Sequence, residues 1–122
     1  HGQLAKMVNQ IAISGVLFGL SEAITFGKSS KLNMDKVFEA ISAGAAQSWQ
    51  LDNRFQTMNA NKFNFGFAVD LMIKDLKIAI KESEKSGKNY FLTKNVLNKY
   101  KKLSKHGNGR LDTSSLIKAI SK

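Results

Sequence analysis

The 122-residue sequence contains no cysteine and no proline, and only two of its nineteen cationic side chains are arginine. Without cysteine, neither disulfide bonds nor a thiolate metal site can hold the chain together. Arginine is the side chain that forms paired hydrogen bonds with phosphates and with base edges in nucleic acids. Because almost all of the cations here are lysine, they are more typical of a solvated protein surface than of a nucleic-acid binding site. The two histidines, His1 and His106, are too isolated to predict a metal site.

The chain has neither the basic start nor the cleavage site of a secretory signal, and without cysteine this favours a cytoplasmic protein. Its length and its 43% hydrophobic content predict one folded domain with a continuous core. Residues 7–26 carry a single charge, Glu22, and therefore need testing as a membrane span. Five polar side chains interrupt that stretch, which favours a helix in a protein core and no membrane partner.

The formal net charge of +10 raises the alternative of a basic helical module that binds nucleic acid or a partner protein. Four lysines surround Tyr100, and such a cluster could grip phosphates while the ring stacks on a base. The same spacing also describes the solvated face of a helix whose other face is buried. We therefore expect no nucleic-acid partner. The four lysines are Lys99, Lys101, Lys102 and Lys105.

The apolar positions repeat with helical spacing along the whole chain, which predicts an all-α fold of five to six helices. Asn33, Ser48 and Thr93 are each placed to cap the start of a helix, and Asp112 or Thr113 to cap the last one. Between the third and fourth helices, the alternating aromatics of residues 63–67 predict an extended loop that buries them. The expected helices cover about 4–27, 33–43, 48–58, 69–86, 93–106 and the residues after 112.

The start of the first helix carries an unusual polar cluster. Lys6, Asn9 and Gln10 are three and four residues apart, so they share one side of an otherwise apolar helix. The next charged residue is Glu22 and the next cation is Lys28. In so basic a chain this gap indicates that Lys6 is placed for a purpose.

Four short motifs follow one another in a familiar order. They are Gly2-x-x-x-Lys6-x-x-Asn9-Gln10, Phe63-x-x-Gly66-Phe67, Lys74-Asp75-Leu76, and Gly107-Asn108-Gly109 before Asp112-Thr113-Ser114-Ser115. In this order they resemble the second domain of the β-hydroxyacid dehydrogenases, the family of 3-hydroxyisobutyrate dehydrogenase and tartronate semialdehyde reductase. The resemblance covers nearly all of the chain.

The resemblance implies a fold like the C-terminal domain of 6-phosphogluconate dehydrogenase, with residues 1–122 forming a helical substrate and dimerisation domain. The glycine fingerprint of a dinucleotide-binding domain is missing from the sequence. We therefore expect that domain elsewhere in a longer enzyme, and expect this fragment to be inactive alone. The full-length protein would use NAD or NADP to interconvert a short 3-hydroxyacid and its semialdehyde, as a homo-oligomer.

The resemblance also implies roles for five side chains. Lys6 would be the catalytic proton donor and acceptor, Asn9 and Gln10 would bind substrate, and Lys74 and Phe67 would contact the cofactor. Each has a plainer alternative, since Lys6 could reach out to solvent and the amides could join helices. Lys74 could be an ordinary charged helix residue and Phe67 a core aromatic. For two further residues we expect structural roles: Asp75 as a partly buried carboxylate that needs a partner, and Trp49 in the core or an interface.

Overall fold

The computed structural model describes residues 2–120, and within that range it contains helices and no strand. The predicted all-α class is confirmed. Five α-helices are followed by a π-helical turn, η1, and a 3₁₀ helix, η2. Their bounds are α1 (Gly2–Ser29), α2 (Met34–Ser42), α3 (Trp49–Asn59), α4 (Val69–Ser86), α5 (Phe91–Leu103), η1 (Ser104–Asn108) and η2 (Thr113–Ala119).

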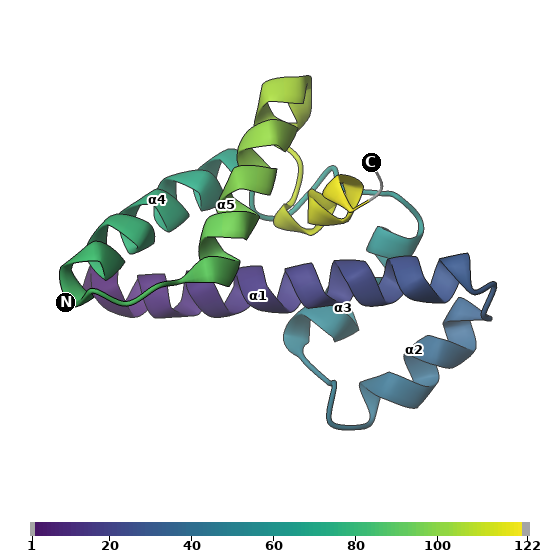
Figure 1. Cartoon of the computed structure of the whole chain (residues 1–122). Coiled ribbons are helices and arrows are strands. Elements are labelled where there is room, and N and C mark those ends of the chain that lie inside the picture. The colour runs from purple at the N-terminus through teal and green to yellow at the C-terminus, as the bar shows by residue number, and fades with distance from the viewer. Residues whose placement is uncertain (1, 121–122) are drawn as a thin grey trace.

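The long helix α1 is the axis of the domain. It runs through the whole molecule, with α4 and α5 on one side and α2 on the other (Figure 1). Its buried stripe includes Met7, Leu17 and Ile24. Ser14 and Ser21 are also buried, and their hydroxyls donate to backbone carbonyls three and four residues earlier in the same helix. The interior of α1 therefore has its polar atoms satisfied.

By length and composition alone, α1 is apolar enough to cross a membrane. Within its most apolar window, 39% of the residues are buried against the rest of the domain. The core helix of a folded domain meets the same criteria as a membrane span, because both need a long apolar stretch. The packing of α1 against four other helices and η2 accounts for its apolar character.

Three of the predicted helix caps are confirmed. The side chains of Asn33, Ser48 and Asp112 each accept a backbone N–H in the first turn of α2, α3 and η2. The prediction for Thr93 is wrong. The fifth helix already begins at Phe91, and Thr93 is buried inside it, where its side chain is in the core instead of capping the helix.

The core is formed mainly by large apolar side chains from α1, α3, α4 and α5. Some large apolar side chains, however, lie outside it. Val8 is 69% exposed, because the buried stripe of α1 passes through its neighbour Met7, and Trp49 is 59% exposed at the start of α3. The largest fully buried side chains include Leu17, Ile24, Leu51, Phe55, Met72, Leu76, Tyr100 and Leu116.

The segment before α4 is the extended loop that the sequence predicts, although only part of it is buried. Phe63 is buried, whereas Phe65 is 38% exposed. The loop is joined to the residues before η2 by backbone hydrogen bonds, from Thr113 N to Phe67 O and from Val69 N to Leu111 O, both 2.8 Å. These hydrogen bonds fix the backbone at Phe67 and at the start of α4, and so set how both are placed relative to α1.

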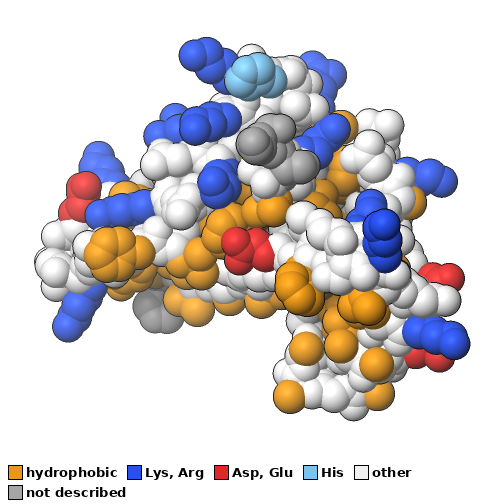
Figure 2. Space-filling model, turned by 45° about the vertical axis from the view of Figure 1, so that its right-hand side comes forward, with side chains coloured by type: hydrophobic (Ala, Val, Ile, Leu, Met, Phe, Trp, Pro, Cys, Tyr) orange, Lys and Arg blue, Asp and Glu red, His pale blue; other side chains and the backbone are white. Residues whose placement is uncertain are grey.

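The lysines of α5 and η1 lie on the outside of the molecule. Lys101, Lys102 and Lys105 are exposed, and Figure 2 shows blue side chains gathered around the pale blue histidine at that end. Tyr100 lies fully buried on the opposite face of the helix. The aromatic ring needed to stack a nucleic-acid base is therefore not available at this surface.

Candidate functional site

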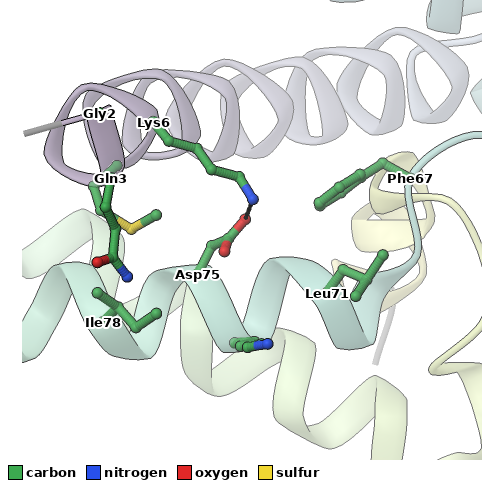
Figure 3. A pocket seen from close by; sticks show the side chains of 9 residues that line it. Gly2, Gln3, Lys6, Phe67, Leu71, Asp75 and Ile78 are labelled. Atoms are coloured by element: carbon green, nitrogen blue, oxygen red, sulfur yellow. Dashed lines mark ion pairs between the residues drawn. The ribbon is translucent and has the colours of Figure 1, made fainter.

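Two neighbouring hollows lie beside the first three turns of α1. One has a volume of about 480 Å³ and lies between α1 and α4 (Figure 3). The other has a volume of about 350 Å³ and is lined by side chains of α1, α3 and the loop before α4. Lys6 and Phe67 line both hollows, so these two side chains stand where the hollows meet. Lys74 lines the first, and Asn9 and Gln10 line the second.

The amine of Lys6 reaches across to α4. Its Nζ lies 3.4 Å from Asp75 Oδ2, the ion pair drawn in Figure 3. The Lys6 side chain is 56% exposed, whereas the Asp75 side chain is 8% exposed. A lysine amine carries three N–H donors, so contact with one carboxylate oxygen leaves donors for a molecule in the hollow. The predicted partly buried carboxylate of Asp75 needs a partner, and among residues 2–120 Lys6 is one of two that contact it.

The second partner of Asp75 is Gln10. Its Nε2 donates to Asp75 Oδ2 at 2.9 Å, and its Oε1 accepts from Asn9 Nδ2 at 3.0 Å. Gln10 is 5% exposed, so both ends of a nearly buried amide are already in use. Asn9 is exposed and keeps its carbonyl oxygen and one N–H for other partners. Of the two amides, Asn9 is therefore the one that a ligand can reach.

Phe67 projects into the space between the hollows from the loop before α4 (Figure 3). Its backbone N–H donates to Asp112 Oδ1 at 2.9 Å. The residue before it, Gly66, has φ = +73°, and a Cβ there would overlap the carboxylate of Asp112. The turn that aims Phe67 therefore requires a glycine beside a buried aspartate.

Asp112 is itself 1% exposed and accepts several hydrogen bonds. Its Oδ2 accepts from Arg54 Nε at 3.0 Å, from Ser114 N at 3.0 Å, and from the Ser114 hydroxyl. From the sequence, Asp112 is expected to cap the last helix and is part of one motif, and no local pattern points to Arg54. The one signal that the sequence offers is that Arg54 is one of only two arginines.

Tyr100 extends this buried network on the side away from the hollows. Its hydroxyl donates to Thr113 O at 2.9 Å. Burial, and to a lesser degree the negative charge of Asp112, raise the pKa of the Tyr100 phenol far above its usual value near 10. Tyr100 is therefore a neutral hydrogen-bond donor. In residues 2–120 no group of three or more His, Cys, Asp or Glu is arranged to hold a metal ion.

The chemistry of the first hollow suits a dinucleotide. Leu71, Ile78 and Phe67 provide an apolar wall of the kind that a flat nicotinamide ring can pack against, and the exposed Lys74 provides a cation for its phosphates and hydroxyls. The second hollow is lined by polar side chains that include Lys6, Asn9 and Arg54, beside the apolar Ile13, Trp49 and Met72. Two hollows that meet at a lysine can hold a redox cofactor beside a small polar substrate.

Comparison with known proteins defines the class. Residues 1–120 match the family model described as NAD-binding of NADP-dependent 3-hydroxyisobutyrate dehydrogenase. The chain belongs to this family of NAD(P)-dependent oxidoreductases, as its motifs imply.

Individual relatives agree with the family match. An uncharacterized oxidoreductase of Shewanella frigidimarina is 47% identical over 99% of this chain and 42% of its own length. A probable mitochondrial 3-hydroxyisobutyrate dehydrogenase-like protein of Arabidopsis thaliana is 34% identical over 98% of this chain and 36% of its own. The chain thus spans about two-fifths of the length of the curated relatives it matches.

A solved structure shares the fold. The 3-hydroxyisobutyrate dehydrogenase of Mycobacterium tuberculosis, solved with L-serine, superposes with a TM-score of 0.88 at 23% identity. The match covers 99% of this chain and 44% of that one.

Proposed function

We propose that the chain is the C-terminal helical domain of an NAD(P)-dependent 3-hydroxyacid dehydrogenase, which interconverts a short 3-hydroxyacid and its semialdehyde. The observation that carries this proposal is the position of Lys6 where two hollows meet, one suited to a dinucleotide and one that offers Asn9 and Arg54 to the substrate. The family match supports the cofactor class. The dinucleotide is held mainly by a domain outside this chain, so residues 1–122 alone are inactive.

Lys6 performs the proton chemistry. A bound oxidised nicotinamide would supply the hydride acceptor for the carbon that bears the substrate hydroxyl. The hydroxyl proton must leave at the same time, and the amine of Lys6 is the group in the hollow that can take it. In the direction of reduction, the ammonium returns the proton and stabilises the developing alkoxide. Asp75, 3.4 Å from the amine, holds Lys6 at the junction of the hollows.

The remaining side chains bind and orient. Asn9 presents its free amide atoms to the substrate, whereas Gln10 keeps Asp75 in place through the 2.9 Å hydrogen bond. Phe67 and Lys74 line the first hollow, where Phe67 would pack against a nicotinamide ring and Lys74 would contact the dinucleotide. Both NAD and NADP are compatible with these contacts.

The setting of the enzyme is part of the same proposal. We infer a cytoplasmic homo-oligomer that binds neither nucleic acid nor membrane. Large apolar side chains on α1, including Val8 and Phe26, at 69% and 71% exposed, are available for contact with a second subunit or with the missing domain. The burial of Tyr100 argues against nucleic acid, and the packed core role of α1 argues against a membrane.

The test is an assay of the full-length protein. Purified enzyme is mixed with NAD⁺ or NADP⁺ and a panel of short hydroxyacids, which includes 3-hydroxyisobutyrate, 3-hydroxypropionate, glycerate and L-serine. We expect reduction of one cofactor with at least one 3-hydroxyacid and none with a simple alcohol such as ethanol. Failure to reduce either cofactor with every hydroxyacid in the panel would refute the proposal.

A further inference from the structure

The guanidinium of Arg54 is held from several directions at the wall of the second hollow. Its Nε donates to Asp112 Oδ2 at 3.0 Å, and its Nη1 donates to Asn53 O at 3.2 Å. The rings of Trp49 and Phe65 lie on it, each with its centroid 5.0 Å from the guanidinium carbon. The side chain is 19% exposed. Its orientation is therefore set before any ligand arrives.

This fixed guanidinium still has donors to offer. An arginine carries five N–H groups in a planar fork, and the contacts among residues 2–120 use two of them. Nη2 donates to no acceptor within the same described residues. A planar cation whose torsional freedom is already lost binds a carboxylate with little further entropy cost.

A purely structural role explains only part of this arrangement. The buried carboxylate of Asp112 also accepts from the backbone of Phe67 and from both donors of Ser114, so its lone pairs have partners besides Arg54. Trp49 remains 59% exposed while it covers the guanidinium and lines the hollow. An exposed indole shields the cation from water on one face, which strengthens its attraction for an anion.

We propose that Arg54 is a specificity-determining residue that binds a carboxylate group of the substrate in the second hollow. This inference rests on the proposed function, because Lys6, which acts on the hydroxyl, lines the same hollow. The carboxylate takes the free N–H donors of Arg54 and the hydroxyl end turns toward Lys6. Arg54 thereby makes the enzyme prefer hydroxyacids over uncharged molecules of the same shape.

The experiment compares a charged and an uncharged substrate on the full-length enzyme. The hydroxyacid that the wild-type protein oxidises best and its methyl ester are assayed with Arg54→Gln, Arg54→Lys and Arg110→Gln. Arg110 is the only other arginine in the chain and is exposed, so its variant matches the charge change away from the hollow. We expect kcat/KM for the acid to fall roughly 10- to 100-fold in Arg54→Gln, as for the loss of a charge-assisted hydrogen bond.

The ester should be oxidised about equally by all variants, because it presents no anion. Arg54→Lys keeps the charge without the planar fork and should show an intermediate loss for the acid only. This variant also carries the test if Arg54→Gln does not fold. Equal losses for acid and ester in the Arg54 variants would mean that Arg54 only supports the structure, and would overturn the inference.

A binding measurement separates this inference from the proposed function. If the wild-type enzyme oxidises no hydroxyacid, the proposed function fails, and the thermal melting shift caused by malonate then decides the role of Arg54. We expect malonate to stabilise the wild type and Arg110→Gln but not Arg54→Gln. No malonate shift in the wild type, or an undiminished shift in Arg54→Gln, would overturn the inference.

Discussion

Two buried aspartates at the ends of the site have cationic partners of different character. Asp75 pairs at 3.4 Å with Lys6, whose side chain is 56% exposed, whereas Asp112 pairs at 3.0 Å with Arg54, whose side chain is 19% exposed. The Lys6–Asp75 pair is a single point contact with a flexible stem. The Arg54–Asp112 pair is locked by stacking rings and further hydrogen bonds.

The difference between the two pairs fits two different roles, proton transfer for Lys6 and a fixed position for Arg54. A group that transfers protons must exchange them with a substrate, so it benefits from exposure and from a loose partner. A group that only binds or orients the ligand benefits from rigidity, because a side chain that is already fixed loses little further entropy when the ligand binds. The cations of both pairs, Lys6 and Arg54, line the second hollow.

The largest expected effect is on turnover and comes from removing the amine of Lys6. In the full-length enzyme, Lys6→Ala should lower kcat by ~10² or more, since proton transfer and alkoxide stabilisation are both lost. The melting temperature should change little, because a half-exposed lysine contributes little to stability and Asp75 keeps its hydrogen bond from Gln10. Steady-state kinetics and thermal melts are the measurements, with Lys77→Ala, an exposed lysine on α4, as the control. Near-normal turnover in Lys6→Ala would remove the assignment.

The second prediction compares the two aspartates directly. Asp112→Asn should lower the free energy of unfolding by about 2–4 kcal/mol, because Arg54 loses its buried partner and a buried amide must face several donors. Asp75→Asn should cost under about 1 kcal/mol, because the lost ion pair is with a lysine that is 56% exposed, and Gln10 can still donate to the amide oxygen. Urea denaturation of both variants gives the two values. Similar losses would show that the pairs do not differ in character.

The smallest expected effect concerns alkaline pH. The pKa of Tyr100 is raised in the folded protein, so folding favours its neutral form. That contribution is fully present below the unfolded pKa of about 10 and is lost progressively as pH rises above it. Tyr100→Phe should be about 1 kcal/mol less stable at neutral pH through loss of the hydrogen bond to Thr113.

Above pH 10 the difference between Tyr100→Phe and the wild type should narrow or reverse. Unfolding free energies from urea melts at pH 7, 9 and 10.5 test this. A constant difference across the series would contradict the assignment of Tyr100 as a buried neutral donor.

Local sequence patterns predicted the fold more completely than the site. Caps at Asn33, Ser48 and Asp112 follow from side-chain chemistry that acts within three residues, and all three are observed. The exposure of Val8 and Trp49 could not be predicted in this way, because burial depends on which helix packs opposite. Spacing of three and four residues brought Lys6, Asn9 and Gln10 together correctly.

Contacts between residues far apart in the sequence limit how much of the site can be predicted from the sequence. Gln10 and Asp75 are 65 residues apart, and Arg54 and Asp112 are 58 apart, so no local spacing indicates either pair. The sequence left open which amide is accessible, and only the long-range bond to Asp75 separates Gln10 from Asn9. Arg54 could not be identified as a site residue for the same reason, since its partners come from three different segments.

These separations also order the assembly of the site as the chain leaves the ribosome. Lys6 is made 69 positions before its partner Asp75, and Asp112, the partner of Arg54, follows later still. Vectorial synthesis forms local helices before such distant pairs can close. The Lys6–Asp75 pair can therefore form first. The Arg54–Asp112 pair, and the turn that positions Phe67, can form only after residues 112–114 have emerged.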